Sequence, residues 1–339
     1  MNVEAQLEAT IRDLVDGRRG ILAADESTGT IGKRFAAVGL ESTPETRRQW
    51  RALLLGAPGL AEAVAGVILF EETLEQCDDA GVPLPEVARR AGLVPGIKVD
   101  KGTAPLPGAP GDRVTHGLDG LEERLRAACA RGARFAKWRE VYPIGPHNPT
   151  PLGIEANAEV LARYAAVCQS LGVVPIVEPE VLIDGDHEID RAAAVCEAVW
   201  HAVFHALHRH GVLLEYTILK PSMVTPGRER RRAPPEEVAE ATLRVLKRTV
   251  PAAVPAVNFL SGGQTPEEAT ANLDAINRRR GNAPWQLGFS FARALQQPAL
   301  EIWAGRPERV AAAQAALVRR ARLAQLAMAG SYEPAMEAA

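Results

Sequence analysis

Short apolar runs alternate with longer segments of helical period along almost the whole chain. We expect the apolar runs to be β-strands, at residues 20–24, 65–70, 96–100, 135–137, 173–178, 217–220, 257–260 and 287–290. Helical segments lie between them, for example at residues 155–171 and 189–208. Strands that alternate with helices predict βα units and a parallel sheet. Eight such units in about 300 residues favour an α/β fold of the closed (β/α)₈ TIM-barrel type.

An open, doubly wound sheet is the alternative architecture. It would place a glycine-rich GxGxxG turn after the first strand, but that turn reads Asp25-Glu26-Ser27-Thr28-Gly29. We therefore expect residues 1–339 to form a single barrel domain, with a short N-terminal helical extension at about 1–19 and a short C-terminal tail at about 331–339. Thr43-Pro44 and Thr265-Pro266 predict capped helix starts, and the Pro/Gly-rich residues 103–111 predict a loop.

Composition excludes several classes of function. A net charge of -3 creates no overall field that would recruit nucleic acid or an anionic membrane. No apolar run approaches the roughly 20 residues of a membrane span, and the N-terminus lacks the basic and apolar segments of a signal peptide. The cysteines form no CxxC pair, which favours free thiols in a reducing compartment. We expect a cytoplasmic protein.

A pair of histidines, His201 and His205, stands one helical turn apart, and this spacing can bind zinc. The apolar stripe of the same segment, which includes Val195, Val199 and Val203, points in the opposite direction. We therefore expect both histidines to face solvent or a neighbouring subunit. We therefore expect no metal at this histidine pair.

The run Leu213-Leu214-Glu215-Tyr216-Thr217-Ile218-Leu219-Lys220-Pro221 delivers one lysine to the end of an apolar strand. Burying a lysine is unfavourable unless the site uses it, and a desolvated amine is a nucleophile for carbonyl groups. Lys220 is therefore a candidate Schiff-base lysine. A lysine that extends past the strand end into solvent would have the same local sequence, and this stretch alone leaves that alternative open.

Charged residues lie at or near the C-terminal ends of most of the expected strands. In a barrel the C-terminal strand ends converge on one mouth, where these charges would meet. They are Asp25, Lys98, Lys137, Arg139, Glu178, Glu180, Lys220 and Arg293. Mixed charges in one cup are costly to assemble without a purpose. A neighbouring cation such as Lys137 would favour the free amine of Lys220, and Glu178 or Glu180 could move protons while a carbinolamine forms and loses water. Asp25 could take a proton from a substrate hydroxyl.

Two candidate anion sites flank this amine. Ser261-Gly262-Gly263 follows a strand and precedes a capped helix, so its backbone N–H groups could approach a phosphate, although a tight βα turn would have the same sequence. Arg293 ends the next strand and could bind the same anion. Thr30, Arg34 and Lys98 are candidates for a second anion site opposite. Two phosphate sites around an amine describe a sugar bisphosphate that is cleaved in its middle.

Six long, ordered segments carry a resemblance to a known family. They are residues 20–29, 96–102, 135–139, 176–180, 219–221 and 259–264. Together they resemble class I fructose-bisphosphate aldolase, and the similarity runs from about residue 20 to about residue 332. The resemblance implies a metal-independent lyase of glycolysis and gluconeogenesis that has no cofactor. It would reversibly cleave fructose 1,6-bisphosphate to dihydroxyacetone phosphate and glyceraldehyde 3-phosphate, as a homotetramer.

The resemblance also implies roles for the catalytic residues. Lys220 would form the Schiff base with the ketose carbonyl, and Glu178, with Glu180 beside it, would be the acid/base for that step. Asp25 would deprotonate the C4 hydroxyl, so that the C3–C4 bond breaks while the iminium takes the electrons. Lys137 would position groups and stabilise charge.

The substrate-binding residues are implied in the same way. Ser261, Gly262 and Arg293 would hold the 1-phosphate, and Lys98 with Thr30 and Arg34 would lie near the 6-phosphate. Two further residues complete the expected set: Arg139, in the same charged wall, and Ser290, which keeps the serine of the family's Ser-Tyr-Gly-Arg motif.

The sequence departs from the family pattern at three places. Ala292 replaces the glycine of that motif and adds a methyl group at the phosphate corner, whereas Thr30 replaces a serine and keeps its hydroxyl. Eukaryotic members end in a longer tail whose terminal tyrosine protonates the enamine carbon. Here the last tyrosine is Tyr332, and we expect either a kinetic penalty or a substitute proton donor.

The sequence is also compatible with other functions. A Schiff-base aldolase with a different sugar-phosphate preference would differ in its relative rates on fructose 1-phosphate and the bisphosphate. A non-catalytic scaffold on the same fold would have lost a central charged residue, yet Lys220, Glu178, Lys137 and Asp25 are all present. A metal-dependent aldolase is disfavoured because no His/Glu cluster gathers at the strand ends.

Overall fold

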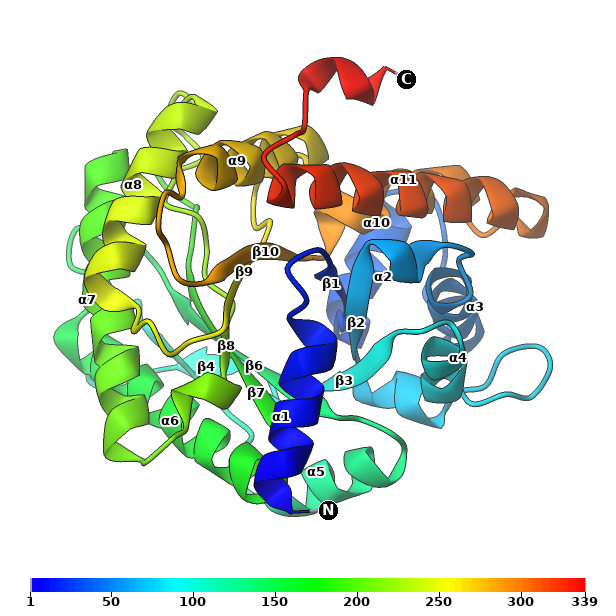
Figure 1. Cartoon of the computed structure of the whole chain (residues 1–339), viewed down its shortest axis with the longest axis horizontal. Helices are drawn as coiled ribbons and strands as arrows, with labels where there is room; N and C mark the ends of the chain where they lie inside the picture. The colour runs from blue at the N-terminus through cyan, green and yellow to red at the C-terminus, as the bar shows by residue number, and fades with distance from the viewer. Residues whose placement is uncertain (1, 339) are drawn as a thin grey trace.

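The computed structural model describes residues 2–338 and contains a closed barrel of eight parallel strands (Figure 1). The strands are β1 (Gly20–Ala24), β2 (Val64–Leu69), β3 (Val94–Lys98), β6 (Phe135–Tyr142), β7 (Val174–Val181), β8 (Ile218–Leu219), β9 (Ala256–Phe259) and β10 (Gln286–Phe291). β1 pairs with β2 on one side and with β10 on the other, which closes the barrel. Each expected strand lies in this barrel, and the predicted (β/α)₈ architecture is confirmed.

Helices surround the barrel in the order of the chain (Figure 1). They are α2 (Thr28–Ala36), α3 (Pro44–Leu55), α4 (Leu84–Arg90), α5 (Leu121–Ala130), α6 (Pro151–Ser170), α7 (Ile189–Arg209), α8 (Pro235–Thr249), α9 (Pro266–Arg279), α10 (Arg293–Trp303) and α11 (Val310–Met328). Short 3₁₀ segments lie between these elements or after the last helix: η1 (Leu60–Glu62), η2 (Glu71–Glu75), η3 (Leu214–Tyr216), η4 (Pro307–Arg309) and η5 (Pro334–Glu337). The predicted caps at α3 and α9 are present, because the hydroxyls of Thr43 and Thr265 accept from the backbone N–H groups three residues later.

The N-terminal end of the barrel is closed by α1 (Val3–Leu14). Its Leu7 and Leu14 are buried in one apolar cluster with Val94, Phe135 and Val174, which begin their strands. A second, larger cluster fills the layer between the strands and the outer helices. Since α1 occupies the N-terminal end, the C-terminal ends of the strands are left to form a site.

Side chains alternate along each strand, so the residue two positions after an inner apolar residue also faces the inside of the barrel, nearer its C-terminal end. On β6, Phe135 belongs to the inner cluster, and Lys137 follows two residues later. On β7, Ile176 precedes Glu178, and Ile218 of β8 precedes Lys220 in the same way. Because alternate residues of a strand face the same side, the charged residues lie directly above the apolar residues that fill the barrel.

One predicted loop differs from the structure. Residues 103–111 contribute β4 (Thr103–Pro105), which pairs antiparallel with β5 (Arg113–Thr115) outside the barrel. Three-residue strands that contain proline leave too short a pattern to be recognised in the sequence.

The histidine-bearing helix has the predicted orientation. His201 and His205 of α7 are exposed, whereas Val195, Val199 and Val203 are buried. In residues 2–338 we find no helix that is both long enough and apolar enough to cross a membrane.

Candidate active site

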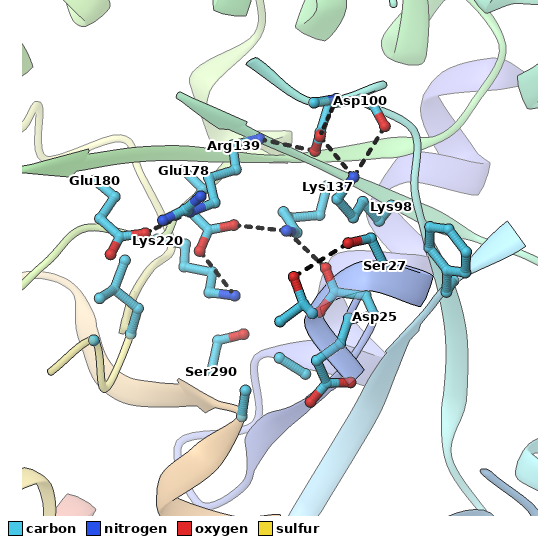
Figure 2. Close-up of a pocket in the computed structure, with 18 of the residues that line it drawn as sticks. Asp25, Ser27, Lys98, Asp100, Lys137, Arg139, Glu178, Glu180, Lys220 and Ser290 are labelled. Atoms are coloured by element: carbon cyan, nitrogen blue, oxygen red, sulfur yellow. Dashed lines mark hydrogen bonds and ion pairs between the residues drawn. The ribbon is translucent and has the colours of Figure 1, made fainter. Parts of the chain in front are cut away.

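A cavity of about 620 Å³ opens at the C-terminal ends of the strands (Figure 2). Twelve of the thirteen residues that the sequence predicts for the site line it: Asp25, Thr30, Lys98, Lys137, Arg139, Glu178, Glu180, Lys220, Ser261, Gly262, Ser290 and Arg293. Most of them come from strand ends that are far apart in the chain, whereas Thr30 comes from α2. The thirteenth residue, Arg34, does not line the cavity.

A chain of four buried charges crosses the floor of the cavity (Figure 2). Nζ of Lys220 lies 3.2 Å from Oε1 of Glu178. The other carboxylate oxygen of Glu178 lies 2.9 Å from Nζ of Lys137, which in turn lies 2.7 Å from Oδ2 of Asp25. Each of these side chains is less than a tenth exposed, so water screens their interactions only weakly.

The charge states of these four residues follow from their burial and from the distances between them. Burial raises the pKa of Asp25, but the charges of Lys137, Lys220 and Lys98 outweigh it and lower that pKa to about 2. For Glu178, burial again opposes the neighbouring cations, and Lys137 and Lys220 hold its pKa below the ordinary value. Burial lowers the pKa of Lys137, yet the carboxylates of Asp25 and Glu178 raise it overall. At neutral pH, Lys137 is therefore a cation between two carboxylates.

Two further ion pairs form one wall of the cavity. Nζ of Lys98 lies 2.6 Å from Oδ1 of Asp100, and Nε of Arg139 lies 2.5 Å from Oε2 of Glu180. The second oxygen of Asp100 accepts from the backbone N–H of Arg139 at 3.3 Å, so this carboxylate joins the two strands (Figure 2). The sequence prediction did not include Asp100. Its spacing of two residues from Lys98 on an extended segment is the signal that could have found it.

A corner of the cavity is equipped to bind an anion. Gly262 allows close approach of the backbone, because a Cβ atom there would lie 2.8 Å from Oε1 of Glu180. The hydroxyl of Ser290 is buried and has no hydrogen-bond partner within residues 2–338. Arg293 is exposed, and it forms no ion pair with any described side chain. This corner therefore offers a hydroxyl, backbone N–H groups and a cation.

Arg34 lies behind the cavity wall that Glu26 forms. Its guanidinium pairs with Glu26, and Nη1 also donates to Oε1 of Gln296 at 3.2 Å. Glu26, which lines the cavity, pairs with Arg51 of α3 as well. The hydroxyl of Thr30 does reach the cavity and lies 3.1 Å from that of Ser27. The site residues that the sequence missed on this side are therefore Glu26 and Ser27.

Tyr332 stands outside the cavity. Its side chain is buried beside α9, and its hydroxyl donates to Oε1 of Glu337 at 2.9 Å. Across the part of the chain that the structure describes, no group of three or more His, Cys, Asp or Glu side chains is arranged to hold a metal ion.

A buried lysine beside a carboxylate at the mouth of a (β/α)₈ barrel, next to an anion-binding corner, defines a class of enzyme that acts on phosphorylated carbonyl compounds through a lysine adduct. Comparisons with known proteins identify the family within this class. The family model described as fructose-bisphosphate aldolase class-I matches residues 6–339.

Curated relatives agree with this match. The chain is 54% identical over 315 residues to fructose-bisphosphate aldolase 6, cytosolic, of Arabidopsis thaliana, covering 93% of this chain and 88% of the relative. It is 56% identical over 317 residues to the cytoplasmic isozyme of Cicer arietinum, with the same coverage. A solved structure of fructose-bisphosphate aldolase from Plasmodium falciparum, in complex with TRAP and a small-molecule inhibitor, superposes with a TM-score of 0.95 at 48% identity, covering 98% of this chain and 96% of that one.

The chain belongs to the class I fructose-bisphosphate aldolase family. It is a glycolytic aldolase, a lyase of the Schiff-base type that requires no metal, and its substrate is a sugar bisphosphate.

Proposed function

We propose that Lys220 is the nucleophile of this aldolase and that Glu178 carries the protons of its reaction. The amine of Lys220 would attack C2 of fructose 1,6-bisphosphate to form a carbinolamine, which loses water to give an iminium ion. Glu178 is within 3.2 Å of the amine and is ionised at rest because its pKa is lowered. It therefore begins as a base, takes a proton from the adding amine and returns it to the departing hydroxyl. Glu180 would hold Arg139 in place beside this step.

The carbon–carbon bond would then break between C3 and C4. Asp25 takes the proton of the C4 hydroxyl, the C4 carbonyl forms, and the electrons of the C3–C4 bond move into the iminium to give an enamine. Glyceraldehyde 3-phosphate leaves. Protonation of the enamine at C3 and hydrolysis of the iminium release dihydroxyacetone phosphate and restore Lys220. Lys137 is a cation 2.7 Å from Asp25 and 2.9 Å from Glu178. It would stabilise the negative charge that develops on the C4 oxygen as its proton is removed.

The two phosphates would bind at opposite ends of the cavity. Ser261, Gly262, Ser290 and Arg293 are proposed to hold the 1-phosphate, with support from the unpartnered hydroxyl and the unpaired guanidinium at that corner. Lys98 and Thr30 are proposed for the 6-phosphate. Arg34 would act there only through Glu26, to which it is bonded.

The observation that carries this proposal is the Lys220–Glu178–Lys137–Asp25 chain, and it is tested by trapping. The protein is incubated with dihydroxyacetone phosphate and borohydride in excess chelator, and the reduced adduct is located by peptide mass. We expect one adduct, on Lys220, and none in Lys220→Met. An adduct on another lysine would overturn the assignment. Activity that disappears in chelator, without any adduct, would point to a metal-dependent reaction, and loss of both to a scaffold.

Substrate preference is tested separately. We expect the wild-type protein to cleave the bisphosphate faster than fructose 1-phosphate, because Lys98 and Thr30 provide for a second phosphate. A faster reaction with fructose 1-phosphate would favour the alternative of a different sugar-phosphate preference.

We propose a cytoplasmic location and an oligomeric assembly for this protein. Relatives from Arabidopsis thaliana and Cicer arietinum are named cytosolic and cytoplasmic, which supports a cytoplasmic location for this protein. We also propose a homotetramer, to which the exposed histidine face of α7 could contribute. Light scattering after size-exclusion chromatography would test the tetramer, and an elution as a monomer would contradict it.

A further inference from the structure

A buried arginine outside the cavity, Arg320 of α11, joins three separate elements. Its side chain is 5% exposed, and all three of its nitrogen atoms have hydrogen-bond partners. These partners lie in α9, in α10 and in the C-terminal segment 332–337. None of them lines the cavity, yet two of the three elements begin at its anion-binding corner.

The contact with α10 replaces a hydrogen bond that the helix cannot make. Pro298 lies inside α10 and has no backbone N–H, so the carbonyl of Ala294 lacks its usual helical donor. Nε of Arg320 donates to this carbonyl at 3.3 Å. Ala294 is the neighbour of Arg293, the cation of the corner, so Arg320 holds the turn from which Arg293 projects.

The contact with α9 also lies in the first turn of its helix. Nη2 of Arg320 donates to the carbonyl of Pro266 at 2.8 Å and to the hydroxyl of Thr270 at 2.7 Å. α9 begins directly after the segment that contains Ser261 and Gly262, and its Asn272 also donates to Gln264 of that segment at 2.7 Å. The same guanidinium therefore sets the first turns of both helices that flank the corner.

The charge of Arg320 is balanced from the C-terminal segment. Nη1 lies 2.6 Å and 2.5 Å from the two oxygens of Glu337, and the hydroxyl of Tyr332 donates to the same carboxylate. Within residues 2–338, Glu337 is the only carboxylate that forms an ion pair with Arg320. A buried guanidinium without a counter-charge is costly, so Arg320 keeps this position only while Glu337 is docked.

We propose that Arg320 is a positioning residue for phosphate binding, and that docking of segment 332–337 through Glu337 holds the first turns of α9 and α10 at the spacing that the 1-phosphate requires. The inference rests on the proposed function, since it takes Ser261, Gly262 and Arg293 as the 1-phosphate site. It assigns to the C-terminal segment a role at this corner that needs no side chain of the segment inside the cavity.

The test compares the two phosphates of the substrate. Glu337→Ala and Arg320→Met are prepared in the full chain, and product inhibition is measured with each triose phosphate. Dihydroxyacetone phosphate carries the 1-phosphate, and we expect its inhibition constant to rise about tenfold, with a parallel rise in KM for fructose 1,6-bisphosphate and less than a twofold change in kcat. Glyceraldehyde 3-phosphate carries the other phosphate, and its constant should not change. General destabilisation of the barrel would not raise the inhibition constant of dihydroxyacetone phosphate while leaving that of glyceraldehyde 3-phosphate unchanged.

Matched variants complete the experiment. Glu333→Gln removes a charge from the same segment, where Glu333 pairs with Arg278 at the surface, and should leave both constants unchanged. Glu337→Asp keeps the carboxylate and should restore part of the affinity. If Arg320→Met does not fold, the Glu337 variants still test the inference, because Glu337 lies outside the barrel and its side chain is 23% exposed.

Two outcomes separate the inference from the function beneath it. A folded Glu337→Ala enzyme that binds dihydroxyacetone phosphate as the wild type does would overturn the positioning role alone. A wild-type enzyme that traps dihydroxyacetone phosphate on a lysine other than Lys220 would overturn the proposed function instead.

Discussion

Lys137 is the residue on which the charge balance of the site depends, because it lies between Asp25 and Glu178. We expect Lys137→Met to lower kcat by at least about 100-fold, since it removes a preorganised cation from the reacting centre. Loss of that cation removes the largest charge that lowers the pKa of each carboxylate, so both carboxylates have a higher pKa than in wild type. They then become protonated at higher pH, so the acid limb of the kcat/KM profile moves upward. A pH-rate series measures both effects.

The control for this variant is Lys33→Met, which removes an exposed lysine of α2 outside the cavity. It should leave kcat and the acid limb in place. A Lys137→Met enzyme whose acid limb coincides with that of the wild type would show that Lys137 does not set the charge state of the two carboxylates.

Glu140 predicts a pH dependence of stability rather than of rate. It is fully buried on the outer side of β6, where Nε1 of Trp138 donates to it at 2.8 Å. Burial raises the pKa of Glu140 from its ordinary value of 4.5 to about 8. A raised pKa means that the folded state holds the proton more tightly, so this stabilisation is complete below about pH 4.5 and is lost as pH rises toward 8.

The variant Glu140→Gln does not titrate. We expect the Tm difference between Glu140→Gln and wild type to shift by a few degrees in favour of the variant as the pH rises from 5 to 8. This shift corresponds to a change in the free energy of unfolding on the order of a few kcal/mol. The exposed Glu155→Gln variant should show no such trend. A Tm difference between Glu140→Gln and wild type that stays constant over this range would contradict a raised pKa.

At the scale of residues, sequence patterns predict which side chains face the cavity better than which ones bond to each other. Lys137, Glu178 and Lys220 each stand two residues beyond an apolar inner position, so alternation alone directs them into the mouth. Arg34 shows the limit. It was expected at an anion site, and only the structure reveals that Glu26 holds it behind the wall. Such pairing joins different elements, and no local pattern encodes it.

At the scale of elements, two helices with the same cap separate stability from binding. Thr43 of α3 and Thr265 of α9 both form capping boxes. We expect Thr43→Ala and Thr265→Ala each to cost about 1 kcal/mol in chemical denaturation. Only α9 follows the Ser261–Gly262 segment, so only Thr265→Ala should also raise KM for fructose 1,6-bisphosphate. Equal KM values in the two variants would contradict a role for the start of α9 in phosphate binding.

The elements themselves were predictable where their patterns are long. Buried strands such as β1 and β2 are continuous apolar runs bounded by turn residues, and α6 and α7 are long helices of clear period. The β4–β5 hairpin was missed because each strand has three residues and most of its stability comes from neighbours, not from its own sequence. The division into an N-terminal extension, a barrel and a tail stays a prediction.

At the scale of the whole molecule, the N-terminal end of the barrel contributes to stability and the C-terminal end carries the site residues. Leu14 of α1 is fully buried in the inner cluster at the N-terminal end. We expect Leu14→Ala to lower the free energy of unfolding by about 2–5 kcal/mol, while kcat at 25 °C stays within about twofold of wild type. Leu152→Ala, at an exposed position of α6, should change neither quantity. A large loss of kcat in a folded Leu14→Ala enzyme would show that the two ends are coupled.

The pairing of β1 with β10 also has a consequence for how the protein is made. Ile21 and Leu22 emerge early from the ribosome, whereas their partners Ser290 and Phe291 are added about 270 residues later. At about 5–20 residues per second, one edge of β1 stays open for roughly 13–54 s. An open, apolar strand edge pairs readily with other chains. The nascent chain is therefore most exposed to aggregation before its last strand appears, and chaperone binding should concentrate in that interval.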